Sequence, residues 1–164
     1  MDNAIAQTYL EVSGRRLDVM ADYVKTCVGK LTDAQVWERH GAHENSVGNL
    51  LLHLSGNARQ WVISGVGGVV DTRTREKEFS ADGGLSRDEL LRIFTETMGE
   101  VRGVITAVPA ERLTEVIHPQ GRTVTVLEAI FVVVTHVHQH TGQIILLTKQ
   151  MTGQDLDLTI PRPR

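Results

Sequence analysis

The fold is decided by one long apolar stretch, TVLEAIFVVVTHVHQHTGQIILLTKQM, which covers residues 125–151. It opens with Thr125 and, three residues later, Glu128, a capping box that satisfies free amide groups at a helix start. The stretch contains no proline and is too long for a typical strand, so it predicts a helix. On that helix His136 and His140 stand one turn apart on the same face, a spacing that can hold a divalent metal.

The same stretch leaves a second interpretation open. Residues 131–138, FVVVTHVH, are rich in β-branched side chains and also fit a buried strand. On a strand His136, His138 and His140 would all face one side, which would suggest a metal site in a small β-barrel. The length and the capping box favour the helix, on which His138 faces away from the other two.

Three further segments carry helical patterns. Residues 3–28 have an approximate apolar stripe that stops at Gly29, and residues 45–65 begin at a capping residue, Asn45 or Ser46. Residues 86–108 begin with a second capping box, Ser86 to Glu89, and end before a proline. Four helices of this length predict an all-α protein, a four-helix bundle, in one domain over residues 1–153 with an extended tail over 154–164.

The composition restricts the class of protein. The 164 residues carry a net charge of −3, which offers no basic surface to nucleic acid or to an anionic membrane. A single cysteine, Cys27, excludes an internal disulfide and suits a reducing compartment. Residues 1–7 lack the pattern of an export signal, and the longest strictly apolar run is too short to cross a bilayer. We therefore expect a soluble, cytoplasmic protein with neither nucleic-acid nor membrane partners.

A third histidine, His53, lies in the second predicted helix, where it could point at the other two. Asn49 and Asn57 lie one turn on either side of it, and Gln143 lies near His140, so these amides could orient ligands or substrate.

A long connection, residues 66–85, joins the second and third predicted helices. It is rich in glycine and charge, and connections of this length are often functional or mobile. We interpret its charged part, Asp71 to Glu78, as solvated surface. The alternative is that Arg73 or Arg75 binds a carboxylate of the substrate.

Three of these motifs resemble the DinB superfamily, also called DinB/YfiT-like. They are NSVGNLLLHLSGN at residues 45–57, Glu78-Phe79, and HVHQHTGQI at residues 136–144. The resemblance covers nearly the whole chain and implies an up-down-down-up bundle with a long crossover between helices two and three. It also implies a three-histidine metal site, whose ligands fall on His53, His136 and His140.

Family members with assigned activities are often thiol transferases or related thiol-dependent enzymes. The resemblance thus implies a metal-dependent enzyme for a small-molecule substrate, with thiol transfer as the first hypothesis and hydrolysis as the second. Three imidazoles leave an open position on a divalent ion, zinc or nickel, at which water or a low-molecular-weight thiol can be activated. The alternatives are a non-catalytic metal-binding module for stress response or interaction, and a metal-free bundle with core histidines. A homodimer is expected in each case.

Overall fold

The computed structural model describes residues 3–41 and 43–158, and helices dominate them. The first half contains α1 (Asn3–Val28), α2 (Asp33–Val36), α3 (Val47–Ala58), the π-helix η1 (Arg59–Ser64) and α4 (Arg75–Ser80). The second half contains α5 (Arg87–Ala107), the 3₁₀ helices η2 (Ala110–Thr114) and η3 (Pro119–Gly121), the strands β1 (Val116–Ile117) and β2 (Val124–Thr125), and α6 (Val126–Thr152). The predicted all-α class is confirmed.

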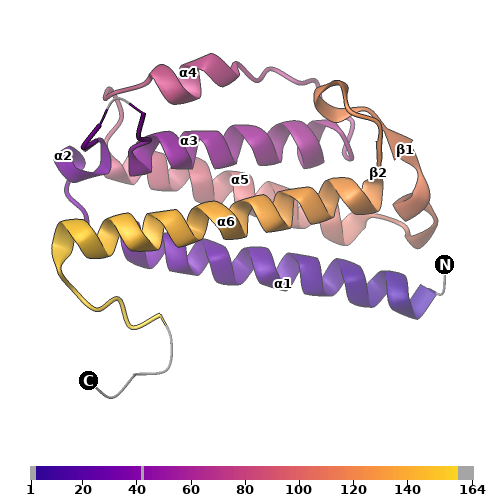
Figure 1. The fold of residues 1–164 in the computed structure, drawn as a ribbon. Coiled ribbons are helices and arrows are strands. Elements are labelled where there is room, and N and C mark those ends of the chain that lie inside the picture. The colour runs from indigo at the N-terminus through magenta and orange to yellow at the C-terminus, as the bar shows by residue number, and fades with distance from the viewer. Residues whose placement is uncertain (1–2, 42, 159–164) are drawn as a thin grey trace.

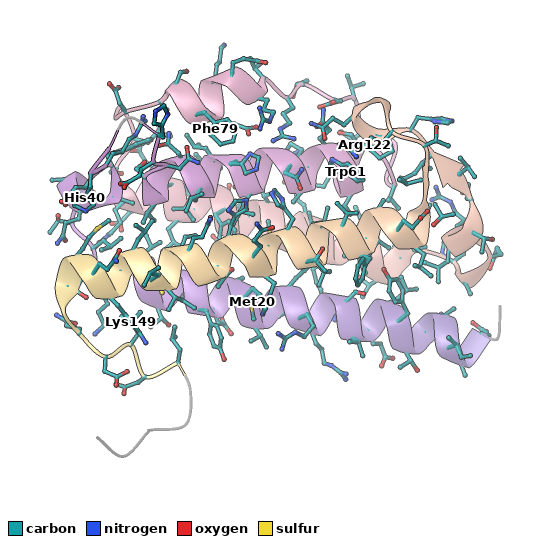
Figure 2. The ribbon with its side chains drawn as sticks, viewed as in Figure 1. Met20, His40, Trp61, Phe79, Arg122 and Lys149 are labelled. Carbon is teal, nitrogen blue, oxygen red and sulfur yellow. The ribbon has the colours of Figure 1, made fainter. Side chains whose placement is uncertain are left out.

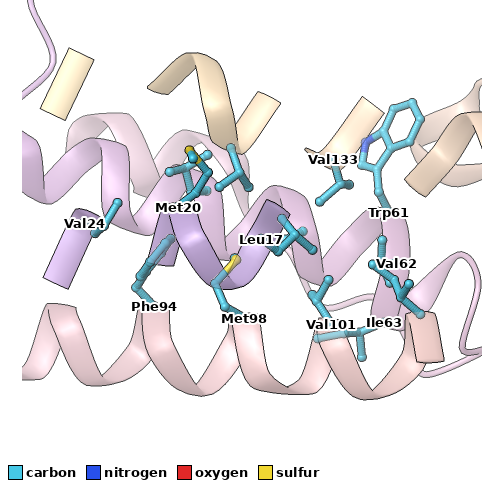
Figure 3. Packing of buried hydrophobic residues seen from close by; sticks show 14 of the residues in the cluster. Leu17, Met20, Val24, Trp61, Val62, Ile63, Phe94, Met98, Val101 and Val133 are labelled. Atoms are coloured by element: carbon cyan, nitrogen blue, oxygen red, sulfur yellow. The ribbon is translucent and has the colours of Figure 1, made fainter. Parts of the chain in front are cut away.

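The long helices α1, α3, α5 and α6 lie side by side, as Figure 1 shows. Helices α1 and α3 each contact both α5 and α6, so the apolar faces of all four enclose one core. In Figure 3, Leu17 and Met20 of α1 lie beside Phe94 and Met98 of α5 in this core. Leu17 and Phe94 are at most 1% exposed. The apolar stripes of the helices are therefore removed from water, which stabilises the fold.

The capping residues mark the helix ends as predicted. The side chains of Ser46, Ser86 and Thr125 each accept a hydrogen bond from the backbone N–H three residues later. The side chain of that later residue in turn accepts one from the backbone N–H of the capping residue. Helix α6 ends at Gly153, whose φ of 64° is left-handed and suits a residue without a Cβ. Because α6 is continuous from Val126 to Thr152, the strand interpretation of residues 131–138 is wrong.

The connection between η1 and α5 runs along the outer side of α3 in Figure 1 and contains α4, which the sequence analysis did not predict. Helix α4 contacts α3. A second unpredicted feature precedes α6, where β1 and β2 pair antiparallel, with Val116 opposite Thr125 and Ile117 opposite Val124. Each strand is only two residues long, too short to show an alternating pattern.

Two further features concern the end of the chain. Leu156, beyond Gly153, is 3% exposed and belongs to the core, so the first part of the predicted tail is packed, while residues 159–164 lie outside the described residues. Helix α6 is long and apolar enough to cross a membrane by length and composition. This is weak evidence, because core helices of soluble proteins meet the same criteria, and α6 packs here against α1 and α3.

Candidate metal centre

Three histidines meet between α3 and α6. His53 comes from the middle of α3, and His136 and His140 come from successive turns of α6. The Nε2 atom of His136 lies 3.2 Å from Nε2 of His53 and 2.9 Å from Nε2 of His140. One ring nitrogen from each of the three residues lies within 4.8 Å of the other two. The structure therefore brings together all three predicted ligands, while His138 is exposed on the other side of α6.

The opposite nitrogen of each ring faces an oxygen atom. Nδ1 of His53 lies 3.0 Å from Glu78 Oε2, Nδ1 of His136 lies 2.9 Å from Asn57 Oδ1, and Nδ1 of His140 lies 2.5 Å from Gln143 Oε1. Nη2 of Arg73, which donates to Glu78, also lies 3.2 Å from Nδ1 of His53. Carboxylate and amide oxygens accept hydrogen bonds, so we assign the hydrogen of each ring to Nδ1, which donates it to the facing oxygen. In the neutral rings every Nε2 then holds a lone pair, and these lone pairs converge on one point.

The spacing of the three nitrogens suits one ion. Zinc binds imidazole nitrogen at about 2.0–2.1 Å, so two ligands of a tetrahedral ion stand about 3.3–3.4 Å apart. The observed Nε2 separations of 3.2 and 2.9 Å differ from this by a few tenths of an ångström at most. The donor set and its tautomers therefore fit a divalent metal. A carboxylate or amide behind each ring is also the usual support of a metal-binding histidine.

The surroundings keep two of the rings in the form that binds metal. Burial, with smaller contributions from His140 and His53, lowers the pKa of His136 from 6.5 to about 4. Burial also lowers the pKa of His140, although its contact with Gln143 acts in the other direction. Both rings are therefore neutral at pH 7, and a metal ion need not displace protons from them.

A buried ion pair supports His53. Arg73 donates from Nε to Glu78 Oε1 at 2.7 Å and from its terminal nitrogen to Oε2 at 2.8 Å. The side chains of Arg73 and Glu78 are only 3% and 9% exposed. Burial opposes ionisation of Glu78, but hydrogen bonds from Arg73 and His53 outweigh it and hold the pKa of Glu78 below its usual range. His53 thus donates to an ionised carboxylate.

The interpretation of Asp71 to Glu78 as solvated surface is wrong for Arg73 and Glu78. Charged side chains are rarely this buried unless they are paired, and here each supplies the partner of the other. The remaining charged residues of α4, Arg75, Glu76 and Lys77, are exposed. The alternative role needs correction for Arg73, which is paired with Glu78. Arg75 is exposed and lies 4.7 Å above the ring of Phe79, and a contact of Arg75 with a substrate carboxylate stays a prediction.

Helix α4 is held over His53 by contacts with α3. Asn49 donates to the backbone oxygens of Glu78 and Ala81 at 2.9 and 2.7 Å, so it anchors α4 and does not touch a ring. Phe79 packs on the imidazole of His53, with 4.7 Å between ring centroids. Gly56 leaves the space that Glu78 needs, since a Cβ there would overlap Glu78 Oε1. Of the three predicted amides, Asn57 and Gln143 contact a histidine directly.

The π-helix η1 adds two side chains that the sequence analysis did not assign to the site. Gln60 accepts a hydrogen bond from Arg73 at 2.9 Å and donates one to Asp71 at 2.7 Å, which extends the support of Glu78. Trp61 donates from Nε1 to Gln120 Oε1 at 3.2 Å. Single π-helical turns occur frequently at functional sites, but no local pattern in residues 59–64 distinguishes one from an ordinary helix.

Cavities adjoin the histidine cluster on two sides. One, of about 340 Å³, includes His136 and Asn57 in its wall, and another, of about 290 Å³, includes Gln143. His40, His43 and His118 are exposed, as expected for loop histidines.

Comparisons with known proteins agree with this fold. The model of a family described as "Protein of unknown function (DUF1572)" matches residues 4–164. A conserved protein of known structure from Enterococcus faecalis aligns with a TM-score of 0.72 at 13% identity, over 88% of this chain and 97% of its own. A DinB-like protein from Bacillus cereus ATCC 10987 aligns with a TM-score of 0.65 at 16% identity, over 82% and 87% of the two chains.

No curated protein sequence matches the chain. At identities this low the structural matches establish the fold alone. Together with the family model they confirm the resemblance drawn from the sequence motifs.

Glu78→Gln should weaken metal binding by about 10- to 100-fold, the usual effect of removing a charged partner behind a metal-binding histidine. The amide keeps the size of the side chain but makes a weaker acceptor for His53 Nδ1–H. Zinc affinity is measured by competition with a chromogenic chelator. Glu76→Gln, on the exposed side of the same helix, is the control. Equal affinities for both variants, each shown to be folded by circular dichroism, would remove Glu78 from the site.

The metal-free protein should lose stability as the pH falls from about 6.5 toward 4. The pKa of His136 is about 4 in the folded protein and 6.5 ordinarily, so in this window the unfolded chain binds more protons and acid favours unfolding. The free energy of unfolding, measured in urea with a chelator present, should decrease between pH 6.5 and 5. This range lies above the titration of Glu78, whose pKa is lowered from 4.5. His136→Gln should reduce this slope and leave the part that His140 contributes, and an unchanged slope would contradict the assignment.

Proposed function

The chain belongs to the DUF1572 family, which is DinB-like, and from this membership and the histidine geometry we propose a cytoplasmic metal-dependent enzyme for small-molecule substrates. The fold that carries the site is proposed as a four-helix bundle in up-down-down-up order, with α4 in the crossover. The strongest support for the proposal is that the three Nε2 atoms converge while each Nδ1 faces an oxygen atom. Histidines that serve only as core residues have no reason to share this orientation.

The proposed ligands are His53, His136 and His140, and the proposed ion is zinc or nickel, because imidazole suits both. Held by three neutral imidazoles, a divalent ion keeps an open position and acts as a Lewis acid toward a thiol or water. No cysteine or carboxylate competes for that position among the groups that the structure places with the cluster, since Cys27 is in the core and Glu78 faces Nδ1 of His53.

The chain's own residues prepare the site for this role. Glu78 holds the Nδ1 proton of His53, and a ring that donates to a carboxylate is a more basic ligand. Asn57 and Gln143 fix the other two rings at Nδ1, so none of the three imidazoles needs to turn when an ion binds. Phe79 covers His53 and limits the access of water from the side of α4.

Thiol transfer is the first proposed reaction and hydrolysis the second. A low-molecular-weight thiol is the proposed co-substrate of the transfer, because the protein's only cysteine, Cys27, is fully buried and burial raises its pKa. The nucleophile in a thiol reaction must therefore come from outside the chain. A non-catalytic metal-binding module remains the alternative, and turnover by the metal-loaded protein separates the two.

Protein purified without a histidine tag should contain one divalent ion per chain by elemental analysis. His53→Ala, His136→Ala and His140→Ala should each lose most of this metal, because two imidazoles rarely retain an ion that three hold. His138→Ala, on the exposed side of the same helix, should keep it. Protein that takes up no ion even after incubation with zinc or nickel would return the histidines to a structural role.

The zinc- and nickel-loaded proteins are then assayed with electrophiles and low-molecular-weight thiols, and with ester and amide substrates. Turnover that disappears in His136→Ala and persists in His138→Ala supports the enzyme. Stoichiometric metal without turnover on either panel supports the binding module, in which metal would raise the unfolding temperature and do no chemistry.

We also propose that the protein is a homodimer. An apolar groove of about 650 Å³ lies between α1 and α6, and Ile5 and Phe131 on it are 61% and 58% exposed. Exposed apolar surface of this kind commonly marks a contact with another protein, and a second copy is the partner always present. Sedimentation velocity should give the mass of a dimer for the wild type and of a monomer for Phe131→Glu. Val70→Glu, at an exposed site outside the groove, should remain dimeric, and a monomeric wild type would contradict the proposal.

A further inference from the structure

The cavity of about 340 Å³ beside His136 has a wall of mixed origin. It is lined by α3 and η1, by the segment between β1 and β2, and by α6. The polar and aromatic side chains that the argument uses are Asn57, Trp61, Gln120, Arg122, His136 and Gln139. Figure 2 shows Trp61 and Arg122 near each other at the end of α3 that faces the strands. A cavity of this size lies at the lower end of the range for small-molecule sites.

The cavity and the histidine cluster share a side chain. His136 presents Nε2 to His53 and His140, and its ring also forms part of the cavity wall. Asn57 accepts from Nδ1 of the same ring and lines the same cavity. A molecule in the cavity therefore lies against an imidazole that would hold the ion.

Among the described residues that line this cavity, Arg122 is the only one with a cationic side chain. Within residues 3–41 and 43–158 its guanidinium makes no hydrogen bond or ion pair. Two other arginines near the site are occupied, Arg73 by Glu78 and Arg59 by Glu100. Among the polar groups around Arg122, Gln120, Gln139 and Asn57 carry no charge, so its charge is not neutralised by the wall.

The segment that carries Arg122 is held in place. Gln120 has a φ of 54°, a left-handed conformation that a residue with a side chain adopts at a cost of about 1 kcal/mol. Its side chain accepts from Trp61 Nε1 at 3.2 Å, and the backbone N–H of Arg122 donates to Pro119 at 3.0 Å. Pro119 is buried and η3 contacts η1. The backbone at Arg122 thus has a defined position relative to the cavity.

We propose that this cavity binds the carboxylate of a small substrate, with Arg122 as the residue that pairs with it. A guanidinium matches a carboxylate through two parallel hydrogen bonds, and one cation among neutral amides suits a single negative charge. A phosphate dianion usually gathers more than one cation or a helix N-terminus, and the cavity offers neither. The inference rests on the proposed function, since it places the reactive end of such a substrate at His136.

The test uses benzoate and benzamide, two probes of the same shape that differ in charge. Binding is followed on ¹⁵N-labelled protein by NMR of the indole N–H groups of its two tryptophans, assigned with Trp37→Phe. Trp61 lines the cavity, whereas Trp37 donates to Leu85 and serves as an internal reference. Both metal-free and zinc-loaded protein are titrated.

Benzoate should shift the Trp61 signal at millimolar concentrations and leave the Trp37 signal unchanged. Benzamide should bind at least about 10-fold more weakly, the difference in affinity expected from the loss of one charged contact. Arg122→Gln should weaken benzoate to the level of benzamide without changing zinc content. Arg92→Gln, which removes an exposed arginine paired with Glu96, should bind benzoate as the wild type does.

Equal affinity for the two probes, or benzoate binding that Arg122→Gln leaves unchanged, would overturn the inference even if zinc binds. Failure to bind zinc, with benzoate binding that still requires Arg122, would instead overturn the proposed metal-dependent function and leave an anion site without its reaction. The benzoate comparison therefore tests the inference, and zinc content tests the proposed function.

Discussion

The structure depends on one constraint, that three imidazoles from two helices direct unprotonated Nε2 atoms at a common point. Without an ion this arrangement sets lone pairs against one another, with Nε2 atoms 2.9 and 3.2 Å apart. It persists because each ring is fixed from behind, at Nδ1, by Glu78, Asn57 or Gln143. Packing of α3 against α6 alone would not select these ring orientations.

The support of His53 explains why the chain needs the long connection between η1 and α5. A carboxylate behind that ring must be buried, and a buried carboxylate requires a cation and further hydrogen bonds. Arg73 and Glu78 both come from this connection, Gln60 continues the network from η1, and Asn49 fixes the backbone of α4. Gly56 leaves room for the pair on the surface of α3. This long connection thus carries part of the site, and the buried pair accounts for a part of its length.

The sequence predicted the parts of this arrangement that depend on local chemistry. The capping boxes at Ser86 and Thr125 fix helix starts through contacts three residues apart, and the phase of a helix alone separates His138 from His136 and His140. The burial of Arg73 and Glu78 could not be predicted in this way, because an isolated run of charges looks the same whether solvent or a distant ring satisfies it. The two-residue strands and η1 likewise pack on elements distant in the sequence or on each other, η1 on η3 and α6 and β1 on β2, and no local pattern encodes these contacts.

The site is divided between two kinds of support. The three histidines lie on long helices whose positions are set by the whole core, so their geometry changes little unless the packing of these helices changes. Other residues near them lie on two short elements, α4 and the segment from Pro119 to Arg122. Helix α4 is held by hydrogen bonds from Asn49 and by the pairing of Glu78 with Arg73 and His53. Trp61 donates to Gln120 in the second segment. Substitutions at exposed positions of these short elements change the charge and shape of the surroundings, whereas a substitution of Glu78 also removes the support of the His53 ring. The helices that place the histidines and the short elements beside them are therefore largely separate parts of the fold.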